Sequence, residues 1–282
     1  MTTVKCIVCD SAVAEPLYAG ILRCRECGHV FADLQLSDEQ LFELYSERFF
    51  TGGEFGDYPA SEPYIRRNFE ARFKVLRSFL DPARHRHLLE IGSAYGFFLD
   101  HVRGHFASAQ GLDITDAGVR YARERLKIDV TQADFLTHDF GARRFDVVCL
   151  WDTIEHLRSP QLFIEKIAAQ TKSGALLALT TGDIGSLNAR LRKERWRMIH
   201  PPTHLHYFSR QTLTRLLDSY GFDVIYDRYC GFHRSADNAA YMVLVLRHGK
   251  TRLYELLRRS RMTKFGFYLN LYDILYVIAR RR

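Results

Sequence analysis

The sequence predicts an α/β protein with a doubly wound, Rossmann-like sheet and a small metal-binding module at its N-terminus. Residues 87–113 contain an apolar run, a glycine turn, a helical segment and a second apolar run that ends at Asp113. A strand, a glycine turn, a helix and an acidic residue roughly twenty positions later form the mononucleotide-binding half of a doubly wound sheet. Two close pairs of cysteines before residue 30 predict the metal-binding module.

The first glycine turn favours a ligand other than a dinucleotide. The apolar run at 88–91 ends at Gly92, and the turn closes at Gly96. This turn, GSAYG, lacks the closely spaced glycines that admit a pyrophosphate. Glu90, at the end of the first strand, is unfavourable for phosphate but suits a cationic amino-acid group. Asp113 can accept hydrogen bonds from both hydroxyls of a ribose.

The later segments supply the remaining strands in order. Apolar runs that read as strands lie at 128–130, 145–151, 176–182, 221–229 and 272–281. Acidic Asp134 follows the first of these runs, and the polar turn Asp152-Thr-Ile-Glu155-His156 follows the second. In an open α/β sheet such residues at the carboxyl ends of strands line the ligand crevice.

These motifs resemble those of class I S-adenosylmethionine-dependent methyltransferases. Glu90-Ile-Gly-x-x-x-Gly96 looks like the family's first motif, and 145–157 is similar to its fourth motif, an apolar strand followed by Asp-x-x-Glu-His. The resemblance implies a seven-stranded methyltransferase sheet and S-adenosylmethionine as cofactor. The cofactor-binding residues that it implies are Glu90, Gly92, Ser93 and Gly96 for the methionine part, Asp113 and Ile114 for the ribose, Asp134 and Phe135 for the adenine, and Asp152 in the pocket wall.

A histidine-containing loop at 201–209 is the predicted acceptor element. Alternation in an extended segment places His204 and His206 on one face. The loop resembles the segment after strand five in sugar methyltransferases of polysaccharide gene clusters, and Thr203 stands where the carbon-methylating members have Glu. The resemblance implies His204 as the base, His206 as its orienting partner and O-methylation of a sugar or related metabolite, although carbon, phenol and quinone acceptors stay open. His156 is a further catalytic candidate; the alternative for all three is a structural role.

The cysteine pattern predicts a closed zinc site. Cys6, Cys9, Cys24 and Cys27 form C-x2-C-x14-C-x2-C. Four thiolates complete a tetrahedral zinc shell without an open position, so the expected role is structural. Two disulfides are the alternative, which a cytosolic setting disfavours.

The predicted organisation has three parts. Residues 1–36 form the zinc ribbon, 37–82 a helical connector or lid, and 83–282 the methyltransferase domain, with an acceptor-side insertion at 183–210 and a helical insertion at 230–270. In the connector, Ser37 and Gln40 predict a capping box. The connector's helices are expected at the residues after Ser37 and at 62–80, and Tyr45, Tyr58 and Tyr64 are candidates for either core packing or an acceptor pocket.

The distribution of charge along the chain favours some candidate partners over others. The chain has a net charge of +7, but residues 1–36 carry three basic and four acidic side chains, so nucleic-acid binding by the ribbon is disfavoured. Residues 247–282 carry ten basic and two acidic side chains, and the basic amphipathic segment within them suits an anionic membrane surface. The basic cluster of Arg192, Lys193, Arg195 and Arg197 around Trp196 is either a phosphate or carboxylate site for an anionic acceptor or a solvated face.

Length and hydropathy favour a cytoplasmic enzyme, with the inner face of the membrane as a further location. No run of eighteen uncharged apolar residues occurs, and the N-terminus lacks the pattern of a secretory signal. Two alternatives to a small-molecule or glycan methyltransferase remain at this point. One is an RNA methyltransferase that grips its substrate with the ribbon, and the other is a non-catalytic scaffold that binds S-adenosylmethionine.

Overall fold

A seven-stranded mixed sheet forms the centre of the protein. The computed structural model describes residues 5–34, 37, 40, 61–260, 262–263 and 265–282. The strand order is β10-β13-β8-β7-β4-β5-β6, and β13 alone runs antiparallel to its neighbours β8 and β10. This confirms the predicted doubly wound methyltransferase sheet. The strands are β4 (His87–Ile91), β5 (Ser108–Asp113), β6 (Val130–Gln132), β7 (Phe145–Trp151), β8 (Thr171–Gly182), β10 (Phe222–Tyr229) and β13 (Ile274–Arg281).

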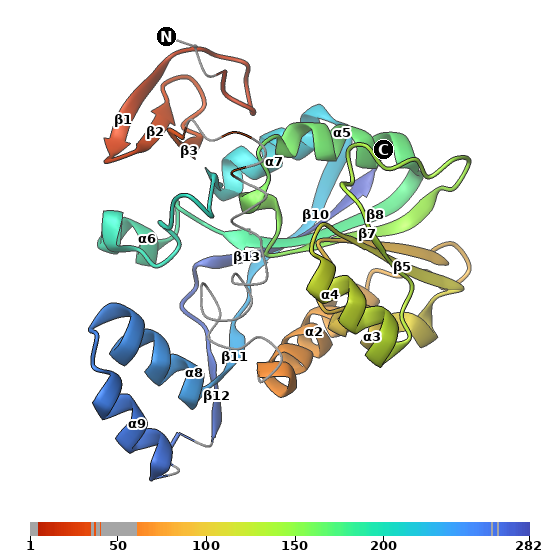
Figure 1. Cartoon of the computed structure of the whole chain (residues 1–282). Helices are drawn as coiled ribbons and strands as arrows, with labels where there is room; N and C mark the ends of the chain where they lie inside the picture. Colours follow the sequence, from red (N-terminus) through yellow and green to blue (C-terminus); the bar gives the residue numbers. More distant parts are fainter. Residues whose placement is uncertain (1–4, 35–36, 38–39, 41–60, 261, 264) are drawn as a thin grey trace.

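Helices cover both faces of this sheet (Figure 1). Because successive strand residues point to opposite faces, Leu88 of β4 joins the core on one face and Leu89 joins the core on the other. The face of Leu88 is covered by α2 (Glu62–Arg77), α3 (Phe97–Val102) and α4 (Asp116–Tyr121), which continues into η4 (Ala122–Leu126); η3 (Arg103–His105) follows α3. The opposite face is covered by α5 (Pro160–Gln170) and α7 (Arg210–Ser219).

The connector is described only in part. Ser37 and Gln40 exchange the predicted reciprocal bonds, Gln40 N to Ser37 Oγ at 3.2 Å and Ser37 N to Gln40 Oε1 at 2.8 Å. The predicted second helix is α2, which ends at Arg77, three residues before the sequence-based limit. Its Phe69, Phe73 and Leu76 are buried. Burial of each such side chain contributes about 1.5–3 kcal/mol to the free energy of folding. Tyr45 and Tyr58 lie outside the described residues, and Tyr64 in α2 is half-buried.

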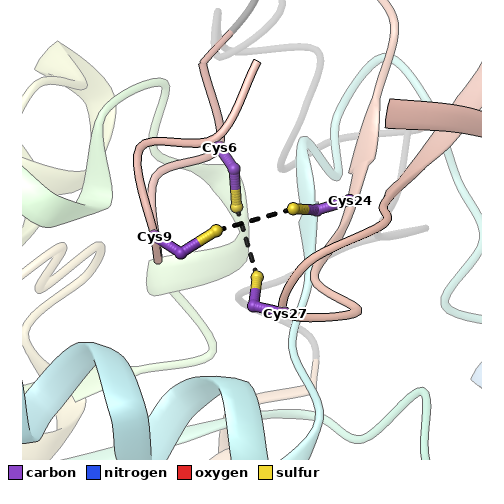
Figure 2. Close-up of side chains that lie close together, drawn as sticks. All are labelled: Cys6, Cys9, Cys24 and Cys27. Carbon is purple, nitrogen blue, oxygen red and sulfur yellow. Dashed lines mark hydrogen bonds between the residues drawn. The ribbon is translucent and has the colours of Figure 1, made fainter. Parts of the chain in front are cut away.

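The ribbon is joined to the methyltransferase domain through a shared sheet. Its strands β1 (Ala14–Tyr18), β2 (Ile21–Cys24) and β3 (Val30–Ala32) are extended by β9 (His206–Tyr207) from the predicted acceptor loop. Phe31 pairs with His206 in this antiparallel ladder. The four cysteine side chains of the ribbon point toward one another (Figure 2).

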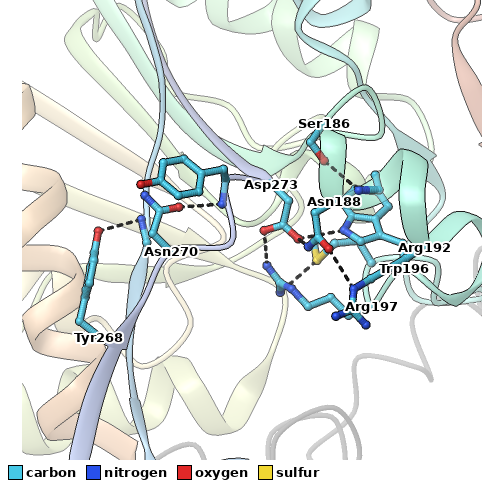
Figure 3. Close-up of polar contacts among 12 residues, drawn as sticks. Ser186, Asn188, Arg192, Trp196, Arg197, Tyr268, Asn270 and Asp273 are labelled. Carbon is cyan, nitrogen blue, oxygen red and sulfur yellow. Dashed lines mark hydrogen bonds and ion pairs between the residues drawn. The ribbon is translucent and has the colours of Figure 1, made fainter.

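The acceptor-side insertion is anchored on a buried carboxylate. It contains α6 (Leu187–Arg192) and η6 (Lys193–Arg195). Asp273, only 1% exposed, accepts hydrogen bonds from Trp196 Nε1 at 2.9 Å, Asn188 Nδ2 at 2.7 Å and Arg197 at 2.9 Å (Figure 3). Arg197 therefore neutralises a buried charge, a role that neither the anion-site nor the solvated-face alternative included.

The insertion before the last strand contains strands as well as helices. β11 (Phe232–Ser235) pairs antiparallel with β12 (Gly266–Leu269), and between them lie α8 (Ala236–Ala240), η7 (Tyr241–Arg247) and α9 (Thr251–Arg259). The expectation of a helical insertion missed this strand pair, because two four-residue strands separated by thirty residues leave no local pattern. None of the described helices has the length and apolar character needed to cross a membrane.

Candidate active site and metal centre

The glycine turn after β4 has a backbone that only glycine adopts without strain. Gly92 and Gly96 have φ values of 75° and 76°. A Cβ atom on Gly92 would lie 2.8 Å from the side chain of Thr153, and one on Gly96 would lie 2.9 Å from Ala122. The turn is therefore fixed against the residues that follow β7, at the point where the strand order reverses.

Asp113 fixes this turn from the end of β5. Its carboxylate accepts hydrogen bonds from Ala94 N at 2.7 Å, Thr115 N at 2.8 Å and Thr115 Oγ1 at 2.6 Å. Burial raises the pKa of Asp113, and the hydrogen bonds from Thr115 and Ala94 oppose that rise. These bonds hold the carboxylate against the turn, and its contact with a ribose stays a prediction. Ile114, the other predicted ribose neighbour, is half-buried beside it.

Buried polar atoms at the carboxyl end of β4 fit the methionine part of S-adenosylmethionine. Glu90 is 1% exposed, and its Oε2 has no hydrogen-bond partner within the described residues; the same holds for Ser93 Oγ. Burial and the nearby charge of Asp113 raise the pKa of Glu90 well above its usual value. An ammonium group of the cofactor would supply the missing donor and the missing positive charge.

The predicted adenine residues divide between surface and core. Asp134 is exposed, and its Oδ1 accepts a hydrogen bond from Leu136 N at 2.8 Å. Phe135 is 3% exposed, and its ring stacks on Phe163 with centroids 5.3 Å apart. The Phe135 ring therefore belongs to the core, and the adenine contact of Asp134 stays a prediction.

Asp152 lies at the end of β7 with a φ of 50°. Its carboxylate accepts from Thr180 Oγ1 at 2.8 Å and pairs with Arg72 of α2 at 2.7 Å. The guanidinium of Arg72 lies 5.5 Å from the centroid of the Trp151 ring. Sequence reasoning missed Arg72, because nothing in the α2 pattern distinguishes an inward-facing arginine from a solvated one.

Two of the predicted catalytic histidines, His156 and His204, meet Glu155 just beyond β7. Glu155 and His156 belong to η5 (Ile154–His156), and His204 comes from the loop before β9. One ligand atom from each of the three lies within 4.8 Å of the others. The rings of His156 and His204 pack edge to face with centroids 4.6 Å apart. Leu205 N donates to Glu155 O at 2.8 Å, which holds the loop against η5.

The Glu155 carboxylate is buried beside His204. Glu155 is 2% exposed, and neither carboxylate oxygen has a hydrogen-bond partner in the described part of the chain. Burial raises the pKa of Glu155 to about 7, although the charge of His204 acts in the opposite direction. The sequence placed Glu155 beside His156 but gave no sign that His204 completes the group.

His206 has different partners from those expected. Its Nδ1 lies 3.1 Å from Nε2 of His29 in the ribbon, and its Nε2 lies 3.2 Å from Arg158 O. Both ring nitrogens therefore serve the contact between ribbon and domain, which corrects the expectation that His206 orients His204. Burial lowers the pKa of His206 to about 4. Burial and the nearby charge of His206 lower the pKa of His29 well below its usual value. The pair is therefore neutral near pH 7.

The four ribbon cysteines form a compact tetrad (Figure 2). Cys6 Sγ lies 3.4 Å from Cys27 Sγ, Cys9 Sγ lies 3.6 Å from Cys24 Sγ, and all four sulfurs lie within 4.8 Å of one another. A tetrahedral zinc with Zn–S bonds of about 2.3 Å has S–S edges of about 3.8 Å. The cysteines are unbonded thiols rather than disulfides, and their arrangement fits zinc.

Residues 64–227 match the family model described as a methyltransferase domain. The chain belongs to this family. Among solved structures, this methyltransferase resembles the magnesium protoporphyrin IX methyltransferase of Synechocystis, which contains bound S-adenosylhomocysteine, with a TM-score of 0.52 and 13% identity over 77% of this chain and 84% of that one. The fold is therefore that of class I S-adenosylmethionine-dependent methyltransferases.

Curated relatives share part of the domain. A ubiquinone biosynthesis O-methyltransferase of Coxiella burnetii is 29% identical over 101 residues, which are 34% of this chain and 43% of that protein. Another from Chelativorans is 27% identical over 128 residues, which are 44% of this chain and 51% of that protein. The methyltransferase thus aligns with only about half the length of these relatives.

Proposed function

We propose that this methyltransferase transfers a methyl group from S-adenosylmethionine to a hydroxyl oxygen of a small acceptor. The observation that carries this proposal is the group of Glu155, His156 and His204 at the same sheet edge as the predicted cofactor residues. Asp152, which the cofactor prediction includes, lies three residues before Glu155. A proton-accepting group beside the cofactor suits a hydroxyl acceptor, and the named relatives are O-methyltransferases.

S-adenosylmethionine supplies an electrophilic methyl group on a sulfonium. The acceptor oxygen forms the new C–O bond while the C–S bond breaks, and the electron pair of that bond stays on sulfur. The hydroxyl proton passes to His204, the proposed base, whose Nδ1–H donates to Met198 O at 2.9 Å. That bond fixes the tautomer in which Nε2 carries the lone pair, the form that a base requires.

The acceptor we propose is a sugar or a related hydroxylated metabolite, free or linked to a nucleotide or lipid. The acceptor loop's resemblance to sugar methyltransferases supports it. A phenolic or quinone-related acceptor is the second candidate, and the names of the curated relatives favour it.

The test uses methyl-labelled S-adenosylmethionine with the zinc-loaded protein and fractionated host extract. Label in sugar-containing or lipid-linked sugar fractions supports the first acceptor class, and label in phenolic lipids supports the second. Label in RNA would contradict both and would make the ribbon a substrate-binding module. Bound cofactor without any transferred label would support the scaffold alternative.

We also propose that the cysteine tetrad holds a structural zinc ion. The convergence of four thiols supports this role, because four protein ligands leave no coordination position for a substrate. The ribbon's three basic and four acidic side chains support packing rather than phosphate binding.

We further propose that this enzyme is cytoplasmic and contacts the anionic inner surface of the membrane. It is supported by α9, where Leu253 and Leu256 are 43% and 65% exposed among arginines that include Arg258 and Arg259. Basic side chains beside exposed leucines suit anionic lipid headgroups. Flotation with phosphatidylserine vesicles tests this: an Arg258→Glu, Arg259→Glu variant should stay unbound while the wild type floats. If the wild type and the variant floated to the same extent, the proposed membrane contact would be wrong.

A further inference from the structure

Arg234 of β11 is a half-buried arginine without an acidic partner among the described residues. Its Nη1 donates to the weak acceptor Met242 Sδ at 3.2 Å, and its guanidinium carbon lies 5.0 Å from the centroid of the Phe232 ring. In the part of the chain that the structure describes, Arg234 has no further side-chain hydrogen bond and no ion pair. A guanidinium has five N–H donors, so most of those of Arg234 remain available.

The acidic residue nearest to Arg234 along the chain is engaged elsewhere. Asp237 accepts hydrogen bonds from Tyr254 OH at 2.9 Å and from Thr263 Oγ1 at 2.8 Å. These contacts join α8 to α9 and to the segment that follows it. Because a charge removed from water is costly unless it is paired, Arg234 is suited to an anion that comes from outside the chain.

A second guanidinium contacts the same aromatic ring. The guanidinium carbon of Arg197 lies 5.2 Å from the centroid of the Phe232 ring. Burial lowers the pKa of Arg234 to about 10, and the charge of Arg197 acts in the same direction. Arg197 already pairs with Asp273, so it contributes its positive field, whereas Arg234 contributes available donors.

The surrounding polar network carries an excess of positive charge (Figure 3). Arg192 Nε donates to Asn188 Oδ1 at 2.9 Å, and Asn188 Nδ2 donates to Asp273 at 2.7 Å. The guanidiniums of Arg192, Arg197 and Arg234 thus accompany one carboxylate, and two positive charges remain. A phosphate group carries a charge of about −1.5 to −2 near pH 7, so it matches this excess better than a single carboxylate does.

The arginines lie beside the segment that orients the proposed base. Met198, which follows Arg197, lines a narrow cavity together with His204, and its carbonyl oxygen accepts from His204 Nδ1 at 2.9 Å. On the other side, Asn68 of α2 donates to His233 O at 3.1 Å and accepts from His233 N. These two contacts hold β11 against α2, so the position of the strand that carries the phosphate-binding candidate is fixed by the fold.

We propose that Arg234, supported by Arg192 and Arg197, binds a phosphate group of the methyl acceptor. This inference rests on the proposed function and narrows its acceptor class to hydroxylated metabolites that carry a phosphate. The planar fork of a guanidinium pairs with two phosphate oxygens at once. His204 keeps its contacts and its role as the proposed base, because no atom of this phosphate subsite comes from it.

Calorimetric titration of the full-length, zinc-loaded protein with inorganic phosphate and, separately, with pyrophosphate tests the subsite. Arg234→Met should weaken binding of the tighter probe about 10- to 100-fold, the usual effect of hydrogen bonds to a charged group. The matched control is Arg215→Met, which removes the same charge from an exposed position on α7 and should bind like the wild type. Tighter binding of pyrophosphate would support a diphosphate-linked acceptor, and tighter binding of phosphate would support a monophosphate.

Thermal unfolding and S-adenosylhomocysteine binding separate this role from a structural one. Without phosphate, Arg234→Met should be at least as stable as the wild type, because it removes a half-buried charge beside Arg197. If Arg234→Met failed to bind S-adenosylhomocysteine, Arg234→Lys would replace it, since that variant keeps the charge but loses the fork and should still bind the probe more weakly.

The outcome for the subsite is independent of the outcome for methyl transfer. Absence of phosphate and pyrophosphate binding in the wild type, or equal affinities of the wild type and the Arg234 variants, would overturn the subsite and leave an uncharged hydroxyl acceptor in place. Weaker binding in a variant that retains S-adenosylhomocysteine affinity would support the subsite even if no label reached a hydroxyl group.

Discussion

The cofactor side and the acceptor side of the sheet edge are built in different ways. On the cofactor side, Glu90, the glycine turn and Asp113 belong to one continuous stretch, and Asp113 bonds directly to Ala94. On the acceptor side, η5 meets a loop about fifty residues later, and His206 meets His29 from a segment 177 positions away. A local unit places the first site, whereas long-range packing assembles the second.

Removal of zinc should have the largest effect on stability, and this effect should be confined to the ribbon. Apparent binding free energies of structural zinc are about 10–16 kcal/mol, so Cys24→Ser should lose the metal and unfold the ribbon. The cofactor crevice uses none of these residues, so S-adenosylhomocysteine binding should persist. Zinc analysis, thermal unfolding and calorimetry measure these effects.

Cys230→Ser is the matched control. Because Cys230 lies outside the tetrad, this variant should keep the zinc ion of the ribbon. If Cys24→Ser lost S-adenosylhomocysteine binding as well as the folded ribbon, β9 would couple the two regions. The cofactor site would then not be an independent local unit.

Substitution at the acceptor side should affect turnover without affecting the cofactor. His204→Asn should lower kcat by about 10²- to 10⁴-fold, the usual contribution of a proton-transfer group, with an unchanged Kd for S-adenosylhomocysteine. Steady-state kinetics and calorimetry provide the two readouts, and His87→Asn is the control. Unchanged turnover in His204→Asn would remove the residue from the mechanism.

Substitution at the cofactor side should have the opposite signature. Gly92→Ala places a Cβ 2.8 Å from Thr153 in a left-handed backbone, and such strain costs about 1–3 kcal/mol. The Kd for S-adenosylhomocysteine should therefore rise about tenfold, as measured by calorimetry. Gly104→Ala is the matched control, because a Cβ there meets no atom within 4 Å. Equal affinities of the two variants would contradict a role for the turn geometry.

The smallest expected effect concerns the anchor of the acceptor-side insertion. Trp196→Phe removes the hydrogen bond to Asp273 and should lower the free energy of unfolding by about 1–2 kcal/mol more than Trp151→Phe. Both indoles are buried, but Trp151 Nε1 has no partner in the described residues, so its loss removes no hydrogen bond. Equal destabilisation in urea unfolding would mean that Asp273 contributes little through this contact.

Sequence patterns predicted the sheet well because each pattern is local. Strand runs, the glycine turn and the cysteine pairs each express a rule that operates within a few residues, and the structure contains all of them. The β11 and β12 pair was missed, because pairing between distant short strands depends on what packs around them rather than on their own residues.

The sequence by itself determined which segments form the strands of the sheet, the glycine turn beside Glu90 and the four thiols of the ribbon, because periodicity, turn chemistry and ligand spacing act locally. Only the tertiary structure decided the partners of the buried charges. It brought Arg72 to Asp152, Arg197 to Asp273 and His29 to His206, and it brought His204 to Glu155 and His156. Such partners are set by long-range packing, since a buried polar group must be matched by whichever element the fold brings beside it.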